Sequence, residues 1–308
     1  MPARRFDKIV KELVVISGKG GTGKTSIVAC IGALAESKVL ADCDVDAADL
    51  HLLLAPEVRH RESFSGGKEA SIRREDCVAC GACLAHCRYE AIRREGGGAG
   101  DAVFAVDPFA CEGCGVCVRS CPVKAIDFRP RASGEWFISE TRHGPMVHAR
   151  LGIAQENSGK LVTVVRKEAA RIARERRLGL VIIDGPPGIG CPVIASICGT
   201  SLVLAVTEPT VSGLHDLERV VDLAAHFKVP VLVCINKCDL NEEMSARIRN
   251  RMAERGLRIA GKVPYDAVVT QAQIAGQSVV EFSRNGVARE IKRLWASVQE
   301  ALEAPPHG

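Results

Sequence analysis

The chain has 308 residues, of which 47% are hydrophobic and 25% charged, and its 41 basic and 37 acidic side chains leave a net charge of +4. This composition is ordinary for a folded globular protein and excludes a chain that is mainly disordered. The small net charge gives no reason to expect a nucleic-acid partner. At roughly 100–200 residues per domain, the length suggests two domains, or one large domain with an insertion.

Short apolar runs alternate with helical patterns along most of the chain. Short Val- and Ile-rich strands alternating with helices are typical of a parallel sheet covered on both faces. We therefore expect an α/β fold with a doubly wound, mostly parallel sheet. The predicted strands cover residues 13–17, 38–41, 178–183, 201–206 and 229–235, and the predicted helices cover residues 25–35, 160–177, 213–227 and 242–255.

Two segments bear on location. The longest uncharged stretch, residues 185–207, is interrupted by prolines and glycines, so it cannot be one continuous membrane-spanning helix. We interpret it as a loop followed by a buried strand. The first residues, MPARR, lack the apolar run of a secretion signal. We therefore expect a cytoplasmic protein without membrane contact.

The segment 57–131 interrupts the alternation and contains an internal repeat. Eight of the fourteen cysteines fall within it, and the pattern of residues 77–92 recurs in residues 111–126. Two copies of one small unit indicate an inserted domain with a pseudo-twofold axis. We predict one discontinuous domain, residues 1–56 and 132–308, and one small α+β insert, residues 57–131.

The loop after the first strand fits the phosphate-binding pattern G-x-x-x-x-G-K-[ST]. Its glycines let backbone N–H groups turn toward phosphate oxygens, and the following helix N-terminus adds positive potential. Lys24 should reach the β- and γ-phosphates, and the Thr25 hydroxyl should coordinate Mg²⁺. The predicted nucleotide-binding residues of this loop are Gly18, Lys19, Gly20, Gly21, Thr22, Gly23, Lys24, Thr25 and Ser26.

The stretch KGGTGKT, residues 19–25, resembles the deviant phosphate loop of the MinD/ParA and nitrogenase-iron-protein ATPases. This resemblance implies that Lys19 crosses a dimer interface to the partner's nucleotide, in a homodimer or in a heterodimer with a related chain. Residues 42–44 resemble the family's first switch, which implies that Asp44 positions the attacking water and contacts the Mg²⁺ shell. The stretch DGPPG, which begins at Asp184, resembles its second switch and implies that Asp184 holds Mg²⁺ through water. The expected catalytic residues are Lys19, Lys24, Asp44 and Asp184, and the expected magnesium residues are Thr25, Asp44 and Asp184.

The segment after the last predicted strand reads N-K-x-D and leaves the base open. It resembles the guanine-reading motif of GTPases, whereas in the MinD-like family an Asn at this place reads adenine and a nearby loop closes over the base. We expect ATP and keep GTP as the alternative. The residues concerned are Asn236, Lys237 and Asp239, with Pro264, Tyr265 and Asp266 in the closing loop.

Two runs of the form C-x2-C-x2-C-x3-C have the spacing of bacterial ferredoxins, in which the fourth cysteine ligates the other cluster. We therefore expect two [4Fe–4S] clusters. Zinc is the competing metal, but zinc sites rarely use such a triple run with a distant fourth ligand. One expected ligand set is Cys77, Cys80, Cys83 and Cys121, and the other is Cys87, Cys111, Cys114 and Cys117.

Most of the remaining cysteines are expected to be small buried hydrophobic residues. Cys191 is the exception. It lies seven residues after Asp184, an offset that resembles the cluster-ligating cysteine of the nitrogenase iron protein. Cys191 is therefore an additional candidate metal or redox residue.

Residues 11–286 as a whole resemble the MinD-superfamily P-loop ATPases that contain an inserted ferredoxin domain. The favoured interpretation is a MgATP-hydrolysing dimer that couples nucleotide state to electron transfer with an unidentified redox or metallocofactor partner protein. A cluster or metal-cofactor assembly ATPase is one alternative, although no C-x-x-C pair occurs outside the insert. A positioning ATPase with a redox-sensing insert is another. Residues 287–302 carry an apolar pattern at helical spacing beside basic residues, which fits a helix packed on the sheet better than a membrane anchor.

Overall fold

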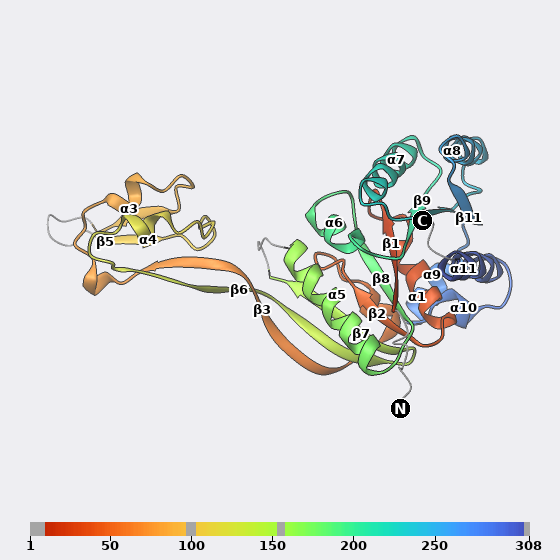
Figure 1. Ribbon diagram of the computed structural model, residues 1–308, viewed down its shortest axis with the longest axis horizontal. Coiled ribbons are helices and arrows are strands. Elements are labelled where there is room, and N and C mark those ends of the chain that lie inside the picture. The colour runs from red at the N-terminus through yellow and green to blue at the C-terminus, as the bar shows by residue number, and fades with distance from the viewer. Residues whose placement is uncertain (1–9, 97–102, 153–157, 305–308) are drawn as a thin grey trace, which may run out of the picture. The chain divides into compact units, whose positions relative to one another are not determined.

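The computed structural model describes residues 10–96, 103–152 and 158–304 (Figure 1). The chain divides into two compact units. Unit 1 consists of Met1–Glu62, Trp136–Arg150 and Ser158–Gly308, and unit 2 consists of Ser63–Glu135 and Leu151–Asn157. Each unit is described separately.

Within the described residues, the main sheet has nine strands, and neighbouring strands follow the order β11-β10-β9-β1-β8-β2-β7-β6-β3. The strand pairs from β11 to β7 are parallel, with Val14 of β1 opposite both Ile183 and Val203. The expected doubly wound, mostly parallel sheet is thereby confirmed. The strands are β1 (Lys11–Ser17), β2 (Lys38–Asp42), β3 (Glu57–Ile72), β6 (Ile126–Thr141), β7 (Gly144–Leu151), β8 (Leu180–Pro187), β9 (Leu202–Thr207), β10 (Val231–Asn236) and β11 (Arg258–Val263).

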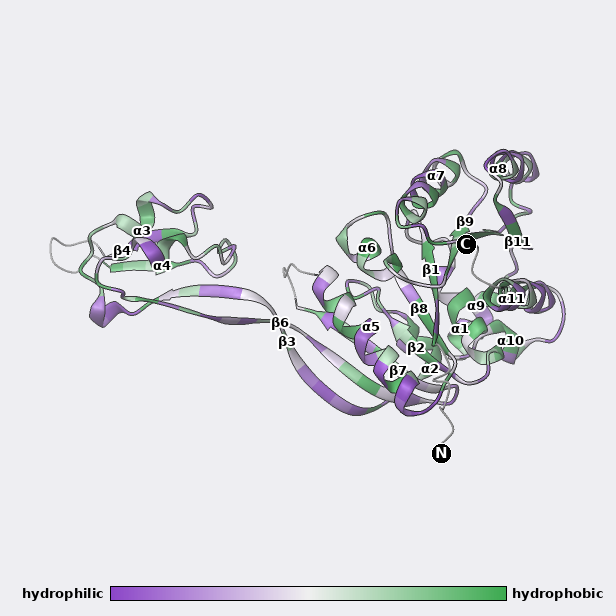
Figure 2. Ribbon diagram, viewed as in Figure 1, coloured by the Kyte–Doolittle hydropathy of each residue, from purple (hydrophilic) through white to green (hydrophobic). Residues whose placement is uncertain are grey.

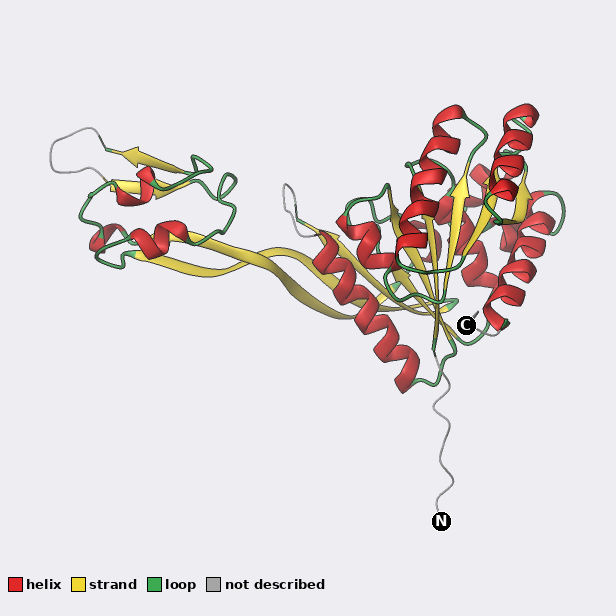
Figure 3. Cartoon of the chain, turned by 45° about the horizontal axis from the view of Figure 1, so that its top comes forward, coloured by secondary structure: helices red, strands yellow, loops and turns green. Residues whose placement is uncertain are grey.

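Helices cover both faces of the sheet in unit 1 (Figure 3). Alternate strand residues such as Leu13 and Val15 pack in one core with α1 and α11. The intervening Val14 and Ile16 are also fully buried, and α5, α6 and α7 pack against β1, β8 or β9. Burial on both faces explains why these strands read as continuous apolar runs. The helices of unit 1 are α1 (Lys24–Leu34), α2 (Leu50–Leu54), α5 (Ser158–Glu175), α6 (Cys191–Ile197), α7 (Val211–His226), α8 (Glu242–Glu254), α9 (Val268–Ile274), α10 (Val279–Phe282) and α11 (Val287–Glu303).

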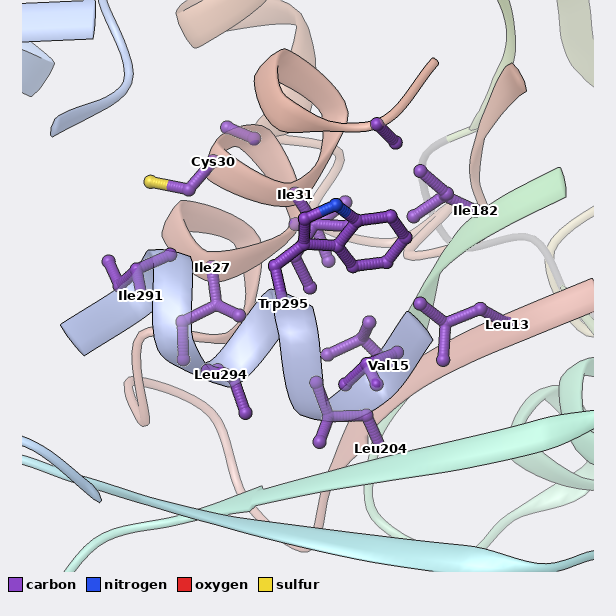
Figure 4. Close-up of a cluster of buried hydrophobic side chains, with 14 of the residues drawn as sticks. Leu13, Val15, Ile27, Cys30, Ile31, Ile182, Leu204, Ile291, Leu294 and Trp295 are labelled. Atoms are coloured by element: carbon purple, nitrogen blue, oxygen red, sulfur yellow. The ribbon is translucent and has the colours of Figure 1, made fainter. Parts of the chain in front are cut away.

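Helix α11 completes the core of unit 1 with its apolar face (Figure 4). Its Trp295 is 7% exposed and packs in one buried cluster with Leu13, Ile31 and Ile182. The polar faces of α8 and α11 are purple in the hydropathy view, in contrast to the green central strands (Figure 2). The helix expected at residues 287–302 therefore packs on the sheet. Within the described part of the chain, no helix combines the length and apolarity needed to cross a membrane.

Unit 2 is small and built on the internal repeat. It contains β4 (Ile92–Glu95) paired antiparallel with β5 (Val103–Val106), the short helices α3 (Ala82–Ala85) and α4 (Val116–Ser120), and a 3₁₀ turn at Arg74–Asp76. Each repeat places a left-handed glycine directly before its helix, Gly81 at φ 76° and Gly115 at φ 71°. Among the described residues of this unit, Ala70, Cys83, Ile92, Phe104 and Ile126 form one small buried cluster.

Several elements depart from the sequence expectation. The stretch 185–207 is expected to be a loop followed by a buried strand; β9 confirms the strand, but the helix α6 lies where the loop was expected, so that part of the interpretation was wrong. Pro192 stands at the start of α6, where its missing N–H costs nothing and its fixed φ favours a helix. Strands β3, β6, β7 and β11 were not predicted.

Candidate nucleotide and cluster sites

The expected catalytic side chains of unit 1 converge at the carboxyl ends of three neighbouring strands. β1 runs into the phosphate loop, while Asp42 at the end of β2 lies opposite Asp184 in β8. Lys24 is the first residue of α1, which follows that loop. Ligands of open α/β sheets bind at this edge, so the topology places the candidate site where the fold favours one.

The phosphate loop is shaped to receive an anion. Gly23 precedes α1 with φ 83°, and a Cβ there would lie 2.3 Å from Asn236 Nδ2, so the position needs glycine. The start of α1 has no side-chain cap and no acidic residue in its first turn. Its N–H groups and positive dipole end are therefore available for phosphate oxygens.

Lys24 lies among three carboxylates. Its ammonium bonds to Asp184 Oδ1 and lies 3.5 Å from Asp44 Oδ2, and the Lys24 side chain is 6% exposed. Burial lowers the pKa of Lys24, but Asp184, Asp44 and Asp42 outweigh that effect and raise it. Burial raises the pKa of Asp42 well above its ordinary value, and the nearby Asp184 raises it further. Burial also raises the pKa of Asp44, although Lys24 opposes the shift.

The carboxylate cluster has unused acceptors. Among the residues that the structure describes, Asp42 Oδ2, Asp184 Oδ2 and Thr22 Oγ1 are buried without a hydrogen-bond partner. A buried carboxylate oxygen without a donor is costly unless a cation or an ordered water satisfies it. Oxygen donors are the ligands that Mg²⁺ prefers, directly or through its waters, so these residues fit a magnesium site.

The N-K-x-D segment is tied to the phosphate loop. Asn236 Nδ2 donates to Thr22 O at 2.7 Å, and Lys237 Nζ donates to Gly21 O at 3.0 Å. Asp239 Oδ1 accepts from the backbone N–H of Tyr265 at 2.6 Å. The motif is therefore hydrogen-bonded both to the phosphate loop and to the loop that is expected to close over the base.

The remaining residues of that loop lie nearby in the chain. Pro264 and Tyr265 follow β11 directly, and the Tyr265 side chain is 54% exposed. Asp266 Oδ1 accepts from Val268 N at 3.0 Å at the start of α9. Gln273 of α9 donates to Ser26 Oγ at 2.8 Å, a contact between this loop region and α1 that the sequence did not suggest.

Lys19 lies on the exposed side of the phosphate loop, within its own chain's network. Its ammonium lies 2.6 Å from Glu208 Oε1 and 3.3–3.4 Å from the hydroxyls of Ser212 and Thr210. The other carboxylate oxygen of Glu208 lies 3.1 Å from Lys237 Nζ. Burial would raise the pKa of Glu208, but the hydrogen bonds from these two lysines lower it overall, so the carboxylate is ionised at neutral pH.

Unit 2 contains two cavities, each lined by four cysteines and otherwise mainly by apolar residues. One is lined by Cys87, Cys111, Cys114 and Cys117, and the other by Cys77, Cys80, Cys83 and Cys121. These are the two ligand sets expected from the sequence, with the fourth cysteine of each run in the cavity of the other. Four thiolate donors in an apolar setting fit a [4Fe–4S] cluster.

The fourth cysteines are held alike in both repeats. The Ala91 N–H donates to Cys87 Sγ at 3.3 Å, and the Ala125 N–H donates to Cys121 Sγ at 3.2 Å. Such N–H···S contacts stabilise a thiolate and are among the levers that set a cluster's potential. The recurring Ala-Ile pair after each run therefore has a structural basis.

Two residues that the structure places at the site had no predicted role of their own, and one candidate gains no support. Asp42 was assigned to the first switch without a role of its own, although an acidic residue at the end of an apolar strand often indicates a ligand-binding site. Glu208, which directly follows the buried strand β9, was given no role. Cys191 is exposed at the start of α6, and within the described residues no group of three or more His, Cys, Asp or Glu side chains could hold a single metal ion.

Comparison with known proteins agrees with this geometry. Residues 70–128 match the 4Fe-4S dicluster domain family, which favours iron–sulfur over zinc. The cell division ATPase MinD of Pyrococcus furiosus is similar in structure, with a TM-score of 0.58, 16% identity, and coverage of 95% of this chain and 99% of that one. The septum site-determining protein MinD of Pyrococcus horikoshii, solved with Mg-ADP, gives a TM-score of 0.59 at 15% identity, covering 96% of this chain and 98% of that one. The chain thus has the MinD/ParA-like P-loop ATPase fold with a 4Fe-4S dicluster domain inserted around residues 70–128.

A closer relative defines the family within that class. The uncharacterized protein MJ0578 of Methanocaldococcus jannaschii is 32% identical over 304 residues, which span 96% of this chain and 98% of the relative. The chain belongs to the family of this protein.

Proposed function

We propose that the protein binds and hydrolyses MgATP as a dimer and couples nucleotide state to electron transfer through two [4Fe–4S] clusters in the cytoplasm. In this proposal residues 1–56 and 132–308 form the ATPase domain and residues 57–131 the cluster domain. The dimer is a homodimer or pairs with a related chain. Donor and acceptor are redox or metallocofactor partner proteins.

The hydrolysis proposal assigns a role to each charged residue of the site. Lys24 contacts the phosphates, and Asp44, whose side chain beside it is 13% exposed, orients the attacking water. Thr25 and Asp184 hold the Mg²⁺ ion. Asp42 lies opposite Asp184 in the neighbouring strand. Mg²⁺, when bound, neutralises phosphate charge. Lys19 contributes to the partner's nucleotide.

The choice between ATP and GTP follows from the hydrogen bonds that the N-K-x-D segment makes. Asp239, the residue that would accept from guanine, already accepts from Tyr265 N with one of its carboxylate oxygens. Asn236 keeps its carbonyl oxygen available for a base while its amide bonds to Thr22 O. This arrangement favours adenine, and competition between ATP and GTP in a binding assay tests it.

The observation that carries the coupling proposal is the short connection between the first switch and the strands leading to the clusters. Asp44 is followed by α2, and α2 leads directly into β3, which continues into unit 2. Leu53 O of α2 accepts from Arg142 Nη2 at 2.7 Å. Arg142 lies in the two-residue turn between β6 and β7, and β6 also continues into unit 2.

The same turn is fixed to the C-terminal part of unit 1. Arg142 Nε donates to Glu281 Oε1 at 2.8 Å, His143 Nε2 lies 2.9 Å from the same oxygen, and Glu281 accepts from Ser278 N at 2.8 Å. Movement of the first switch would therefore act on α2 and, through Leu53 O, on an anchored hairpin. A chain of hydrogen-bonded contacts of this kind, all within unit 1, supports the proposal that the first switch acts on the hairpin that ends in β6.

The test is an anaerobic redox titration with electron paramagnetic resonance, with and without MgATP. A coupling free energy of about 1–3 kcal/mol is usual for linked sites, which corresponds to a potential shift on the order of 40–130 mV for one electron. The bound clusters supply the one-electron chemistry between donor and acceptor proteins. We expect a shift in this range in the wild type and none in Lys24→Ala.

Controls separate binding from hydrolysis. Lys167→Ala, an exposed lysine of α5, should leave the shift unchanged. Asp44→Asn should bind MgATP without hydrolysing it, so a shift in this variant would assign the effect to binding. Equal potentials with and without MgATP, in a wild type that hydrolyses ATP, would refute the coupling and leave the cluster domain as a sensor or docking module.

A further inference from the structure

We propose that Glu208 is a positioning residue that holds Lys19 against its own phosphate loop until the chain pairs around ATP. This inference rests on the proposed function, in which Lys19 acts on the nucleotide of the partner. It adds a residue that sets how readily Lys19 becomes available.

Glu208 is placed for this role by strand register. Ile16 of β1 lies opposite Ala205 of β9, so the segments that follow both strands emerge side by side at the site edge. The Glu208 carboxylate then lies 2.6 Å from Lys19 Nζ. A lysine in this contact cannot at the same time extend toward a second protomer.

The backbone holds Glu208 in a tight turn. Glu208 O accepts from Thr210 N at 2.8 Å, and Thr210 caps α7 by accepting from Gly213 N at 2.9 Å. A Cβ at Gly213 would lie 2.3 Å from Glu208 O. The carboxylate is therefore presented from a fixed position rather than from a loosely placed surface side chain.

Lys237 lowers the free-energy cost of separating Lys19 from Glu208. Its ammonium lies 3.1 Å from Glu208 Oε2 and also donates to Gly21 O at 3.0 Å. When Lys19 leaves, Glu208 keeps this second cation, so no carboxylate is left without a partner in a side chain that is only 18% exposed. The phosphates of a partner's nucleotide carry more charge than one carboxylate and would compete for Lys19.

The expected change in dimerisation is modest for one ion pair. Its free energy counts twice in a dimer, so the fold-change is squared. A partly exposed ion pair changes an equilibrium constant by about two- to fivefold. Forming the dimer breaks two such pairs, one in each protomer. Removing the Glu208 charge should therefore tighten dimerisation by about four- to twenty-five-fold.

The experiment is sedimentation velocity of the holoprotein over a range of concentrations, with the non-hydrolysable analogue MgAMPPNP. Glu208→Gln should dimerise at concentrations about four- to twenty-five-fold lower than those that the wild type needs. Glu218→Gln is the matched control, because Glu218 also makes a 2.6 Å pair, to Arg251, but away from the phosphate loop. It should dimerise like the wild type.

A double variant separates positioning from a general structural effect. Lys19→Met should weaken dimerisation, and Glu208→Gln should have no further effect in that background. Glu208→Asp, whose shorter side chain withdraws the charge without removing it, should be intermediate and serves if Glu208→Gln does not fold.

The outcomes are distinct for the inference and for the function it rests on. A Glu208→Gln variant with the dimerisation constant of the wild type, or one whose tightening persists in Lys19→Met, would overturn the role of Glu208 and leave the ATP-dependent dimer intact. A wild type that stays monomeric with MgAMPPNP at all concentrations would overturn both.

Discussion

Replacing Lys24 with Met should destabilise the chain even when no nucleotide is present. Its ammonium contacts Asp184, whose side chain is 1% exposed, and Asp44 at 3.5 Å. Asp42, 0% exposed, is a third acid near the same point. Removing the cation leaves these carboxylates buried without compensation.

The magnitude follows from burial. Breaking a buried ion pair by removing one partner costs about 3–5 kcal/mol, whereas an exposed pair is worth about 0–1 kcal/mol. Lys19→Met is the matched control, because the Lys19 side chain is 31% exposed and Glu208 retains Lys237. We therefore expect a difference of a few kcal/mol between the two variants.

The pH dependence has a defined sign. Burial raises the pKa values of Asp42 and Asp44 above the ordinary 3.8, so the folded state binds more protons than the unfolded state above that pH. Stability from this cluster therefore falls as the pH rises through the folded pKa values. Without Lys24 the carboxyl pKa values rise further, so the deficit of Lys24→Met should be larger at pH 8 than at pH 5.5.

The assay is urea unfolding of the holoprotein followed by far-ultraviolet circular dichroism, with EDTA and without nucleotide. The double variant Lys24→Met/Asp184→Asn should recover much of the lost stability, because it removes a charge that Lys24 compensates. If Lys24→Met is as stable as Lys19→Met at both pH values, the argument that this cluster is held together by one buried cation is refuted.

Three further predictions concern the cluster cavities, the anchored hairpin and the core. Cys121→Ser and Cys80→Ser should each lose about half of the bound iron, and the double variant should lose no more than either, because both residues line one cavity; an additive loss would contradict the crosswise ligation. Burial would raise the pKa of Glu281, but its hydrogen bonds lower it to about 2. This contribution to stability is present above about pH 4.5 and lost as the pH falls toward 2, so Glu281→Gln should cost about 2 kcal/mol at pH 7, and less at pH 3, in urea unfolding. Trp295→Ala should cost about 3–5 kcal/mol in the same assay, against less than about 0.5 kcal/mol for Arg293→Ala on the exposed side of α11.

The parts of the fold that sequence reasoning predicted are those whose signal is local. The strands β1, β8, β9 and β10 are buried on both faces, so each is an uninterrupted apolar run that needs no knowledge of its neighbours. The phosphate loop was also predictable, because its motif fixes the spacing between Gly18 and Lys24 within one short segment. The cysteine runs likewise carry their chemistry in their spacing.

The missed strands lack such a local signal. Most side chains of β3 are exposed, and the strand contains Gly66 and Gly67, so no alternation of apolar and polar residues marks it. Its pairing with β6 depends on contacts made far along the chain. Arg258–Val263 was missed for a similar reason, because most of its side chains are only partly buried at the edge of the sheet.

The missed site residues depend on register rather than on motif. Glu208 meets Lys19 because β9 lies beside β1, and no pattern within either segment records that neighbourhood. Asp42 and Asp44 differ by burial, which separates the acid that faces the protein interior from the one that can reach water. Both distinctions appear only when the strands are assembled.

The crosswise arrangement of the cysteine cavities has a consequence for the assembly of unit 2. Its apolar core is small, and one of its buried members, Cys83, is itself an expected ligand. Since each cavity takes cysteines from both repeats, inserting either cluster would join the two halves of the unit, and metal binding of this kind is also folding free energy. Either cluster alone would then link the two repeats through the four cysteines of its cavity. A chain that has lost one cluster to oxidation would therefore keep the two halves of the unit joined through the other cluster.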